Sequence, residues 1–445
     1  MKLYSANDNY KLYQGNMLDM LEVIEANSID SIVTDPPYEL NFMGKGWDNA
    51  GVSFQKETWK QCYEVLKPGG YLLAFGGSRT FHRIACAIED AGFEIRDTIM
   101  WLYGSGFPKS MNIGLAIDKK NGVESPIINT GKSGVSSRAY QSEKTTTAGQ
   151  YEIKKAQNEW KGWGTALKPS FEPIIVARKP FKGSLVDNVI QYGVGGINID
   201  ECRVAFNDNE PDNRVGKKDI QKGAMKNPWG AKSDYDNTTY KTNGRFPANT
   251  ILTYDDTDFD EVCGGFPYTK GEIGRAGRKN GGNYNASSYK VGVVTDYGLK
   301  DSGSASRYFM NCKYTEKDKD FRRYIYTPKA SKKDRDEGLE NFDEQETKVT
   351  NQYGMPREDG SIREVLFKKN IHPTVKPTNL MQYLVRLATP KGAIILDPFM
   401  GSGSTGKAVM YENKERNKNY KFIGIELEPE YLNISKARLD FVIKK

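Results

Sequence analysis

The sequence predicts an α/β fold in which both ends of the chain build one largely parallel sheet, with a separate irregular domain inserted between them. Three observations support this prediction. The first hundred residues alternate short apolar runs with amphipathic stretches, and the same alternation returns after residue 379. Between residues 181 and 330, Gly, Asn, Asp and Tyr dominate and helical patterns are few. A chain of 445 residues has room for two or three domains of roughly 100–200 residues each.

The composition is that of a folded protein. Hydrophobic residues make up 38% of the chain and charged residues 27%, which is enough apolar surface for a core and excludes disorder throughout. The net charge of +7 permits an anionic partner without requiring one. No apolar run approaches the roughly 18–20 residues of a membrane span, and the first residues lack a signal-peptide core. We therefore expect no membrane partner and a cytoplasmic location.

Metal binding is not expected. The five cysteines form no C-x-x-C pair, and the only histidines are His82 and His372. Neither a zinc cluster nor a disulfide framework is therefore indicated.

The elements follow in order along the chain. Gly69, Gly70 and Gly92 lie where helices are expected to end. The stretch 104–165, rich in Gly, Ser, Thr and Lys, is expected to be a flexible surface insertion, and the charged segment 331–348 a solvated connector. The expected strands lie at 31–34, 71–77, 93–103, 170–180, 392–398 and 421–429, and the expected helices at 57–67, 78–92 and 379–389. The domain boundaries that result are 1–180, 181–325, 326–371 and 372–445, of which the first and last share the sheet.

A glycine-rich turn follows the apolar strand near the C-terminal end. Residues 393–405, AIILDPFMGSGST, predict a buried strand, a tight turn and the start of a helix, whose backbone amides suit a carboxylate or a phosphate. A second strand ends about 25 residues later in Glu426, where a carboxylate can accept hydrogen bonds from ribose hydroxyls. The two features together predict a cofactor that contains a nucleoside.

The same turn has two other interpretations. Residues 401–407 also match G-x-x-x-x-G-K, the phosphate loop of nucleotide hydrolases. Ala408 follows where that loop needs Ser or Thr for magnesium, and Asp397 would place a carboxylate against a triphosphate, so both disfavour a hydrolase. A turn that binds no ligand is the second alternative, because one glycine cluster is a weak signal.

A rigid turn follows the first apolar strand. In Asp35-Pro36-Pro37-Tyr38 the two prolines fix the backbone and remove two N–H donors, so the turn presents carbonyl oxygens and one carboxylate. Acceptors of this kind can hold an amino group whose lone pair is delocalised into a heteroaromatic ring, and Tyr38 adds a flat face for a base. A purely structural Pro-Pro turn remains the alternative.

Three segments carry a resemblance to a known family. TDPPYEL (34–40), HPTVKP (372–377) and LDPFMGSGSTG (396–406) resemble amino-group DNA methyltransferases that depend on S-adenosylmethionine. The order, with the catalytic motif before the cofactor motif, resembles their permuted β group. Further segments, such as GYLLAFGGSRT (70–80) and GRFPANTIL (244–252), resemble phage or prophage-type modification methylases. The resemblance implies a Rossmann-like methyltransferase sheet with an inserted target-recognition domain.

The resemblance also implies roles for individual residues. Asp35 and the Pro36 carbonyl would bind the target amino group while Tyr38 stacks on the flipped base. Asn16 stands where the family usually has an acidic residue near the cofactor adenine, so we expect weaker cofactor affinity. The residues implied in cofactor binding are Asn16, Lys376, Pro377, Asp397, Phe399, Gly401, Gly403, Ser404, Thr405 and Glu426.

The implied reaction is direct methyl transfer to the N6 amino group of adenine in duplex DNA. Asp as the first residue of D-P-P-Y resembles the adenine-modifying members, and N4-cytosine remains the alternative. None of the cysteines lies in a Pro-Cys pair, which disfavours the nucleophilic chemistry used at cytosine carbon 5. RNA or protein as substrate, and a DNA-binding protein whose methylation site has decayed, stay open. A homodimer and an accompanying restriction endonuclease also remain open as partners.

A basic region is expected to contact DNA. Residues 265–330 contain 13 Lys and Arg against 6 Asp and Glu, interleaved with aromatic side chains, as in a duplex-binding surface. We assign the target-recognition domain to 181–325, and a solvated irregular region is the alternative. The expected DNA-contacting residues are Arg275, Arg278, Lys279, Arg322 and Arg323.

Overall fold

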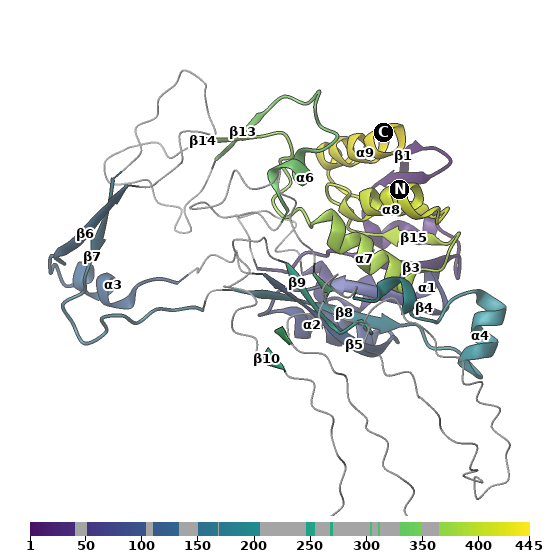
Figure 1. Ribbon diagram of the computed structural model, residues 1–445, viewed down its shortest axis with the longest axis horizontal. Coiled ribbons are helices and arrows are strands. Elements are labelled where there is room, and N and C mark those ends of the chain that lie inside the picture. Colours follow the sequence, from purple (N-terminus) through teal and green to yellow (C-terminus); the bar gives the residue numbers. More distant parts are fainter. Residues whose placement is uncertain are drawn as a thin grey trace, which may run out of the picture.

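The computed structural model describes eleven stretches of the chain (Figure 1). They are residues 1–40, 51–103, 110–132, 150–167, 169–204, 246–253, 268–269, 303–304, 310–311, 330–348 and 365–445. No helix in these stretches combines the length and the apolar character that a membrane crossing requires.

A ten-stranded sheet forms the centre of the described structure. Its order is β1-β2-β16-β15-β3-β4-β8-β5-β9-β12. β2, near the N-terminus, pairs in parallel with β16, near the C-terminus, which confirms that both ends of the chain build one sheet. The strand bounds, in sheet order, are Lys2–Ala6, Tyr10–Gln14, Lys421–Glu426, Ile394–Asp397, Ile29–Thr34, Leu66–Phe75, Phe171–Arg178, Glu94–Tyr103, Thr250–Thr253 and Met310–Asn311.

The sheet is mostly parallel, as expected, with two antiparallel strands. β8 runs antiparallel to both of its neighbours, β4 and β5, and β1 runs antiparallel to β2. The other described neighbours in the sheet pair in parallel. The sequence predicts the strand at 170–180 but not its direction, because direction depends on which strands it joins.

Helices cover both faces of the sheet (Figure 1). On one face, α7 (Thr378–Ala388), α8 (Ser404–Arg416) and α9 (Pro429–Lys444) pack against the strands. On the other lie the 3-10 helix η1 (Met17–Glu22), α1 (Lys56–Val65) and α2 (Phe81–Asp90). All six residues of β3 are buried, as is typical of parallel strands between two helical layers.

The two central strands define a crevice. β15 and β3 are parallel neighbours, and Ile395 lies opposite Ser31. The chain leaves β15 for α8 on one face of the sheet, whereas the helix after β3, α1, lies on the other face. Ligands bind where connections diverge in this way at the carboxyl ends of parallel strands. Both predicted motifs follow directly from these two strand ends.

The segment 331–348 differs from the expected solvated connector. It begins with α6 (Lys332–Asp336), in which Arg335 is buried, and Leu339 after it is fully buried against α9. β13 (Gln345–Lys348) then pairs with β14 (Val365–Lys368). The Asp334 carboxylate instead pairs with the buried Lys407 on α8, and the Asp334 carbonyl oxygen accepts a hydrogen bond from the buried Arg438 on α9.

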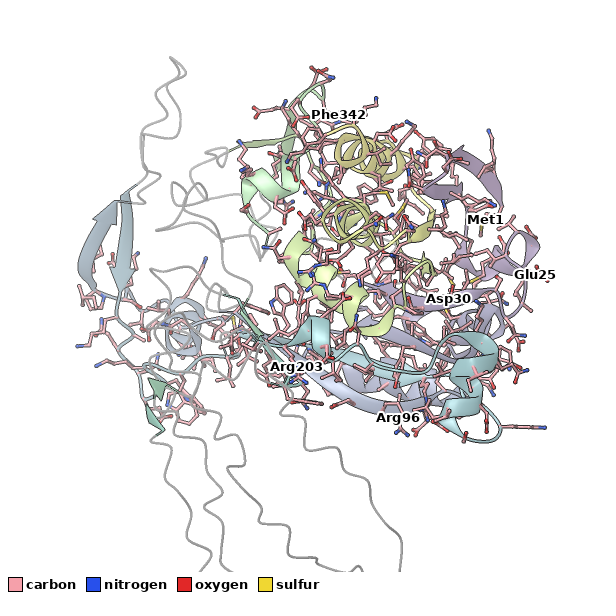
Figure 2. The ribbon with its side chains drawn as sticks, turned by 45° about the vertical axis from the view of Figure 1, so that its right-hand side comes forward. Met1, Glu25, Asp30, Arg96, Arg203 and Phe342 are labelled. Atoms are coloured by element: carbon pink, nitrogen blue, oxygen red, sulfur yellow. The ribbon has the colours of Figure 1, made fainter. Side chains whose placement is uncertain are left out.

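The insertion 104–165 contains ordered elements. α3 (Ile113–Lys120) is followed by a hairpin of β6 (Ile127–Lys132) and β7 (Gln150–Lys154), and these lie to one side of the sheet in both Figure 1 and Figure 2. The buried Asp118 carboxylate accepts hydrogen bonds from the Ser125 hydroxyl, the Gln157 backbone amide and the Asn158 side chain. These contacts join segments that are far apart in the sequence, so no periodic pattern of residues predicts them.

The described start of the predicted inserted domain belongs to the sheet domain. α4 (Leu185–Tyr192) packs on β4, where the Asn188 side chain donates to the Pro68 carbonyl oxygen at 3.1 Å. Glu201 forms an ion pair with Lys418. β9 and β12 also lie within 181–325 and extend the main sheet. The described parts of 181–325 therefore contact the sheet domain.

Candidate active site

A cavity of about 830 Å³ lies at the carboxyl ends of β3 and β15. The structure brings the two predicted motifs together there, although they are more than 350 residues apart in the chain. The predicted site residues that line the cavity are Asn16, Asp35, Pro36, Pro37, Tyr38, Lys376, Asp397, Phe399, Gly401, Ser404, Thr405 and Glu426.

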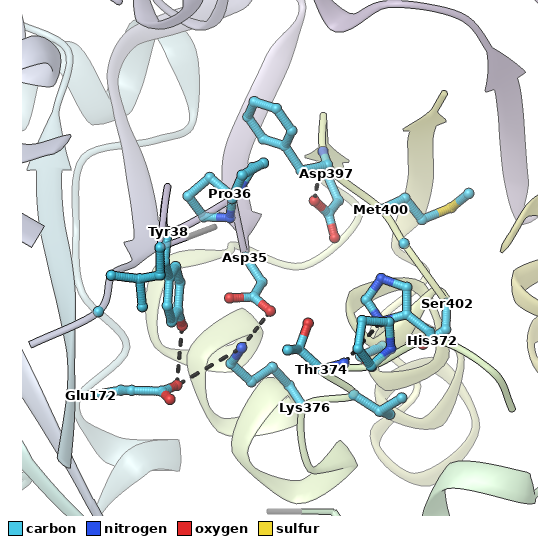
Figure 3. A pocket seen from close by; sticks show the side chains of 18 of the residues that line it. Asp35, Pro36, Tyr38, Glu172, His372, Thr374, Lys376, Asp397, Met400 and Ser402 are labelled. Atoms are coloured by element: carbon cyan, nitrogen blue, oxygen red, sulfur yellow. Dashed lines mark hydrogen bonds and ion pairs between the residues drawn. The ribbon is translucent and has the colours of Figure 1, made fainter. Parts of the chain in front are cut away.

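Asp35 presents an unused acceptor to the cavity. Its Oδ2 accepts a charge-assisted hydrogen bond from Lys376 Nζ, as Figure 3 shows. Its Oδ1 is buried and has no hydrogen-bond donor among the described residues. A buried carboxylate oxygen without a donor costs free energy, so it favours a ligand that brings an N–H group.

Lys376 lies between two carboxylates. Its Nζ is 3.8 Å from Glu172 Oε2 as well as paired with Asp35, and it lies 4.9 Å from the centre of the Phe75 ring and 5.2 Å from that of Tyr38. Burial lowers the pKa of Lys376, while the charge of Asp35 and its hydrogen bond act in the opposite direction. One cation therefore fixes one oxygen of Asp35 and leaves the cluster with an excess of negative charge.

Glu172 is a site residue that the sequence analysis missed. It lies on β8, lines the cavity, is only 6% exposed, and its Oε2 accepts a hydrogen bond of 3.0 Å from the Tyr38 hydroxyl. This bond fixes the Tyr38 ring beside the cavity (Figure 3). A single carboxylate within the apolar strand 171–178 was the available signal, because a buried charge in a strand needs a partner.

Asp397 joins the two motifs. Its Oδ1 accepts from the Thr34 hydroxyl at 2.7 Å and from the Phe399 amide at 3.2 Å, and its Oδ2 accepts from the Thr405 hydroxyl at 2.7 Å. Burial raises the pKa of this carboxyl to about 6, against the effect of these three hydrogen bonds. Asp397 therefore fixes the end of β3 against the glycine-rich turn.

Glu426 ends β16 at the rim of the glycine-rich turn. Its carboxylate accepts from the Gly401 amide at 2.7 Å and from the Glu428 amide at 2.8 Å. Burial raises the pKa of Glu426 to about 7, although both hydrogen bonds favour the ionised form. Gly401 has φ 53°, and a Cβ there would lie 2.6 Å from the His372 ring, so only glycine fits this position.

Two predicted cofactor residues lie outside the cavity lining. Pro377 precedes the first turn of α7, where its fixed φ of −60° suits a helix start. Gly403 precedes α8 with φ 74°, and a Cβ there would lie 2.8 Å from Ser435 Cβ, so this glycine allows α8 to approach α9. Their contributions are to the backbone of the site rather than to its surface.

Asn16 lines the cavity but also caps a helix. Its side-chain oxygen accepts from the Leu18 amide at 3.1 Å at the start of η1. A carbonyl oxygen has a second lone pair, so a further hydrogen bond to a ligand remains geometrically open.

The loop with His372 and Lys376 is held by α6. The Arg335 guanidinium donates to the His372 carbonyl oxygen at 2.8 Å, and both residues line the cavity. The Thr378 amide donates to Asp334 at 2.8 Å. The resemblance covers HPTVKP, but the helix that positions it has no motif of its own, so the sequence analysis assigned Arg335 no role.

Lys407 contradicts the nucleotide hydrolase alternative. This lysine would have to face the glycine-rich turn, but it is fully buried and does not line the cavity. Its Nζ lies 2.7 Å from Asp334 Oδ1 and 2.9 Å from Glu337 Oε2. The lysine therefore stabilises the contact between α8 and the segment around α6.

The cavity fits a cofactor that contains a nucleoside. It combines the start of α8, the Glu426 carboxylate, and apolar surface from Phe399 and Ile425. The five basic residues predicted to contact DNA, at positions 275, 278, 279, 322 and 323, lie outside the described residues.

Comparison with known proteins identifies the family. A family model described as DNA methylase matches residues 29–437. Type II methyltransferase M.HindIII of Haemophilus influenzae is 24% identical over 229 residues, which cover 42% of this chain and 64% of that protein. Type II methyltransferase M.HpaI of Haemophilus parainfluenzae is 35% identical over 109 residues, 22% of this chain and 34% of that protein. The chain thus spans less than two thirds of the length of these relatives.

One solved structure aligns with this chain over its full length. The PvuII DNA methyltransferase (cytosine-N4-specific) has a TM-score of 0.40 at 13% identity, over 100% of this chain and 95% of that one. The family match, which includes both motifs of the cavity, confirms S-adenosylmethionine as the cofactor. The chain belongs to the DNA methylase family, within the β group of N6-adenine and N4-cytosine methyltransferases.

Proposed function

We propose that the protein transfers a methyl group from S-adenosylmethionine to the N6 amino group of adenine in duplex DNA. The observation that carries this proposal is the buried Oδ1 of Asp35, an acceptor in the cofactor cavity for which the described residues provide no donor. S-adenosylmethionine supplies an electrophilic methyl group when it is bound.

The residues around Asp35 suit a substrate amino group that receives the methyl group. Positive charge develops on the amine nitrogen as it is alkylated, and a preorganised carboxylate stabilises that charge. Lys376 fixes the orientation of Asp35 through Oδ2. The Tyr38 ring, held by Glu172, offers a face on which the flipped base stacks. Flipping costs a few kcal/mol, which stacking and phosphate contacts offset.

The preference for adenine rests on the first residue of D-P-P-Y. One relative carries this specificity in its name: DNA adenine methyltransferase YhdJ of Escherichia coli, 35% identical over 79 residues, 18% of this chain and 25% of that protein. N4-cytosine is the second candidate, because both reactions alkylate an exocyclic amine and the Asp35 acceptor serves either.

The test is methyl transfer to unmethylated DNA. The purified protein is incubated with DNA and methyl-labelled S-adenosylmethionine, and the nucleosides are separated by mass spectrometry. We expect label in N6-methyladenine, and sequencing of the product then maps the site. Label in N4-methylcytosine would reassign the base, and absence of label from DNA would contradict the proposal.

The DNA contacts proposed for the basic region have their own test. We propose that residues 181–325 contain the target-recognition domain and that the five basic residues Arg275, Arg278, Lys279, Arg322 and Arg323 contact DNA. Replacing one that contacts phosphate by Gln should reduce the slope of log affinity against log salt by about 1 without changing the methylated site. Loss of a base contact should relax the site instead. If none of the five variants shows either change, the assignment is wrong.

Cofactor affinity is expected to fall at acidic pH. Burial raises the pKa of Glu426 to about 7, and only the ionised carboxylate is a full acceptor for ribose hydroxyls. The dissociation constant for S-adenosylmethionine should therefore be constant above pH 8 and increase up to about tenfold per pH unit below 7. Titration calorimetry from pH 5.5 to 8.5 measures this.

A matched pair of variants isolates the Glu426 carboxylate. Glu426→Gln should bind the cofactor about tenfold more weakly at pH 8 and show little change between pH 5.5 and 8.5. Glu430→Gln, at an exposed position on α9 outside the cavity, should keep the wild-type pH profile. If Glu426→Gln kept the pH dependence of the wild-type protein, this carboxylate would be ruled out as the titrating group.

A further inference from the structure

The loop that returns from the insertion to β8 reaches the mouth of the active-site cavity. Thr165, Ala166 and Leu167 all line the cavity, and the Leu167 side chain is 92% exposed. We propose that this loop is a DNA-contacting arm whose Leu167 enters the duplex where the target base leaves it, while Lys155 and Lys161 hold a neighbouring phosphate. This inference rests on the proposed function.

The geometry of the loop suits a wedge. The Ser110 hydroxyl accepts hydrogen bonds from the Thr165 amide at 2.9 Å and the Ala166 amide at 3.3 Å, and the Thr165 hydroxyl accepts one from the Met111 amide at 2.9 Å. The backbone is therefore held up to residue 166, directly before an apolar side chain with almost no packing. Proteins that open a duplex commonly insert apolar side chains such as leucine between bases.

Two exposed lysines, Lys155 and Lys161, lie on the same arm. Backbone hydrogen bonds fix both positions: the Lys155 amide donates to the Pro126 carbonyl oxygen at 3.0 Å, and the Lys161 amide donates to the Asn158 carbonyl oxygen at 3.1 Å. Exposed cations at fixed positions suit contacts with DNA phosphates.

Exposed aromatic rings adjoin the lysines. Trp160 and Trp163 are 41% and 58% exposed, and their rings meet edge to face at 5.2 Å. Exposed indole rings next to cations are typical of nucleic-acid-binding surfaces, where they stack on bases or sugars. Arg79, which is exposed and also lines the cavity, adds a cation from a different part of the chain. Charge, aromatic surface and position therefore favour DNA as the partner.

The wedge is tested with two unmethylated oligonucleotide duplexes that contain the sequence the protein methylates. In one the target base is paired, and in the other it faces an abasic position, so that no base pair has to be broken. Leu167→Ala should lower the methylation rate about tenfold or more on the paired duplex and less than about threefold on the other. Leu167→Phe should restore most of the rate on the paired duplex. Leu3→Ala, at an exposed leucine on β1 outside the cavity lining, is the matched control and should match wild type on both.

Each outcome decides between the proposals. Equal losses by Leu167→Ala on both duplexes, or none on the paired duplex, would overturn the wedge and leave the proposed function intact. No methyl transfer by the wild-type protein to any DNA would overturn the proposed function, and the wedge with it. For the phosphate contact, Lys155→Gln/Lys161→Gln should reduce the salt slope of DNA binding by about 1 to 2 while cofactor affinity stays unchanged. An unchanged slope would remove the lysines from the DNA surface.

Discussion

Replacing Asp35 by alanine is expected to lower the methyl transfer rate by about 10³-fold or more, while the dissociation constant for S-adenosylmethionine changes less than about threefold. The reason is the division of contacts at this carboxylate. Oδ2 pairs with Lys376, and Oδ1 has no donor among the described residues, so it is the acceptor left for the substrate amine. The residues expected to bind the nucleoside and methionine parts of the cofactor, Glu426 and Ser404 among them, lie on other elements.

The Asp35→Ala experiment separates loss of chemistry from loss of fold. Lys376 keeps Glu172 at 3.8 Å in the variant, so its buried charge retains a partner, and the unfolding midpoint should change little. Single-turnover methylation gives the rate, and titration calorimetry gives the cofactor affinity. Asp90→Ala, at an exposed carboxylate on α2 outside the cavity lining, should behave as wild type. Full activity in Asp35→Ala would exclude the catalytic role.

The centre of the site was predictable because its signals are local. The turn at Asp35 and the turn after Asp397 each follow an apolar strand, and the carboxyl ends of adjacent parallel strands meet at one edge of a sheet. The order of motifs along the chain also required both ends to share that sheet. The pairing of β2 with β16 confirms it.

The positions of Glu172 and Arg335 were not predictable because they depend on contacts between distant segments. Glu172 reaches Lys376 only because β8 inserts antiparallel between β4 and β5. Arg335 reaches the His372 loop because α6 packs on α8 and α9, whereas its sequence, a run of alternating charges, is equally typical of a solvated segment. Long-range pairing of buried charges leaves no periodic pattern in sequence.

Lys407→Met is expected to lower the free energy of unfolding by about 3–5 kcal/mol, because it leaves two carboxylates facing a buried position without their cation. Lys407 Nζ contacts the Asp334 carboxylate, the Asp334 carbonyl oxygen at 2.9 Å and Glu337. Through Asp334 the same cluster holds Thr378 at the start of α7 and Arg438 on α9. Removal of the ammonium therefore weakens the packing of several elements around the cofactor cavity.

Urea unfolding followed by circular dichroism measures the change in stability of Lys407→Met. The two interpretations of the glycine-rich turn predict different results. In a phosphate loop the lysine would contact a nucleotide, so its loss would abolish Mg²⁺-dependent ATP hydrolysis and leave stability nearly unchanged. If Lys407 is instead a buried structural cation, its loss should lower stability. Neither the wild-type protein nor Lys407→Met should then hydrolyse ATP. Lys414→Met, at an exposed position on the same helix, should shift stability by less than about 0.5 kcal/mol. A Lys407→Met protein as stable as wild type would show that the carboxylates find another partner, and that the cluster around Asp334 does not hold α6 against α8.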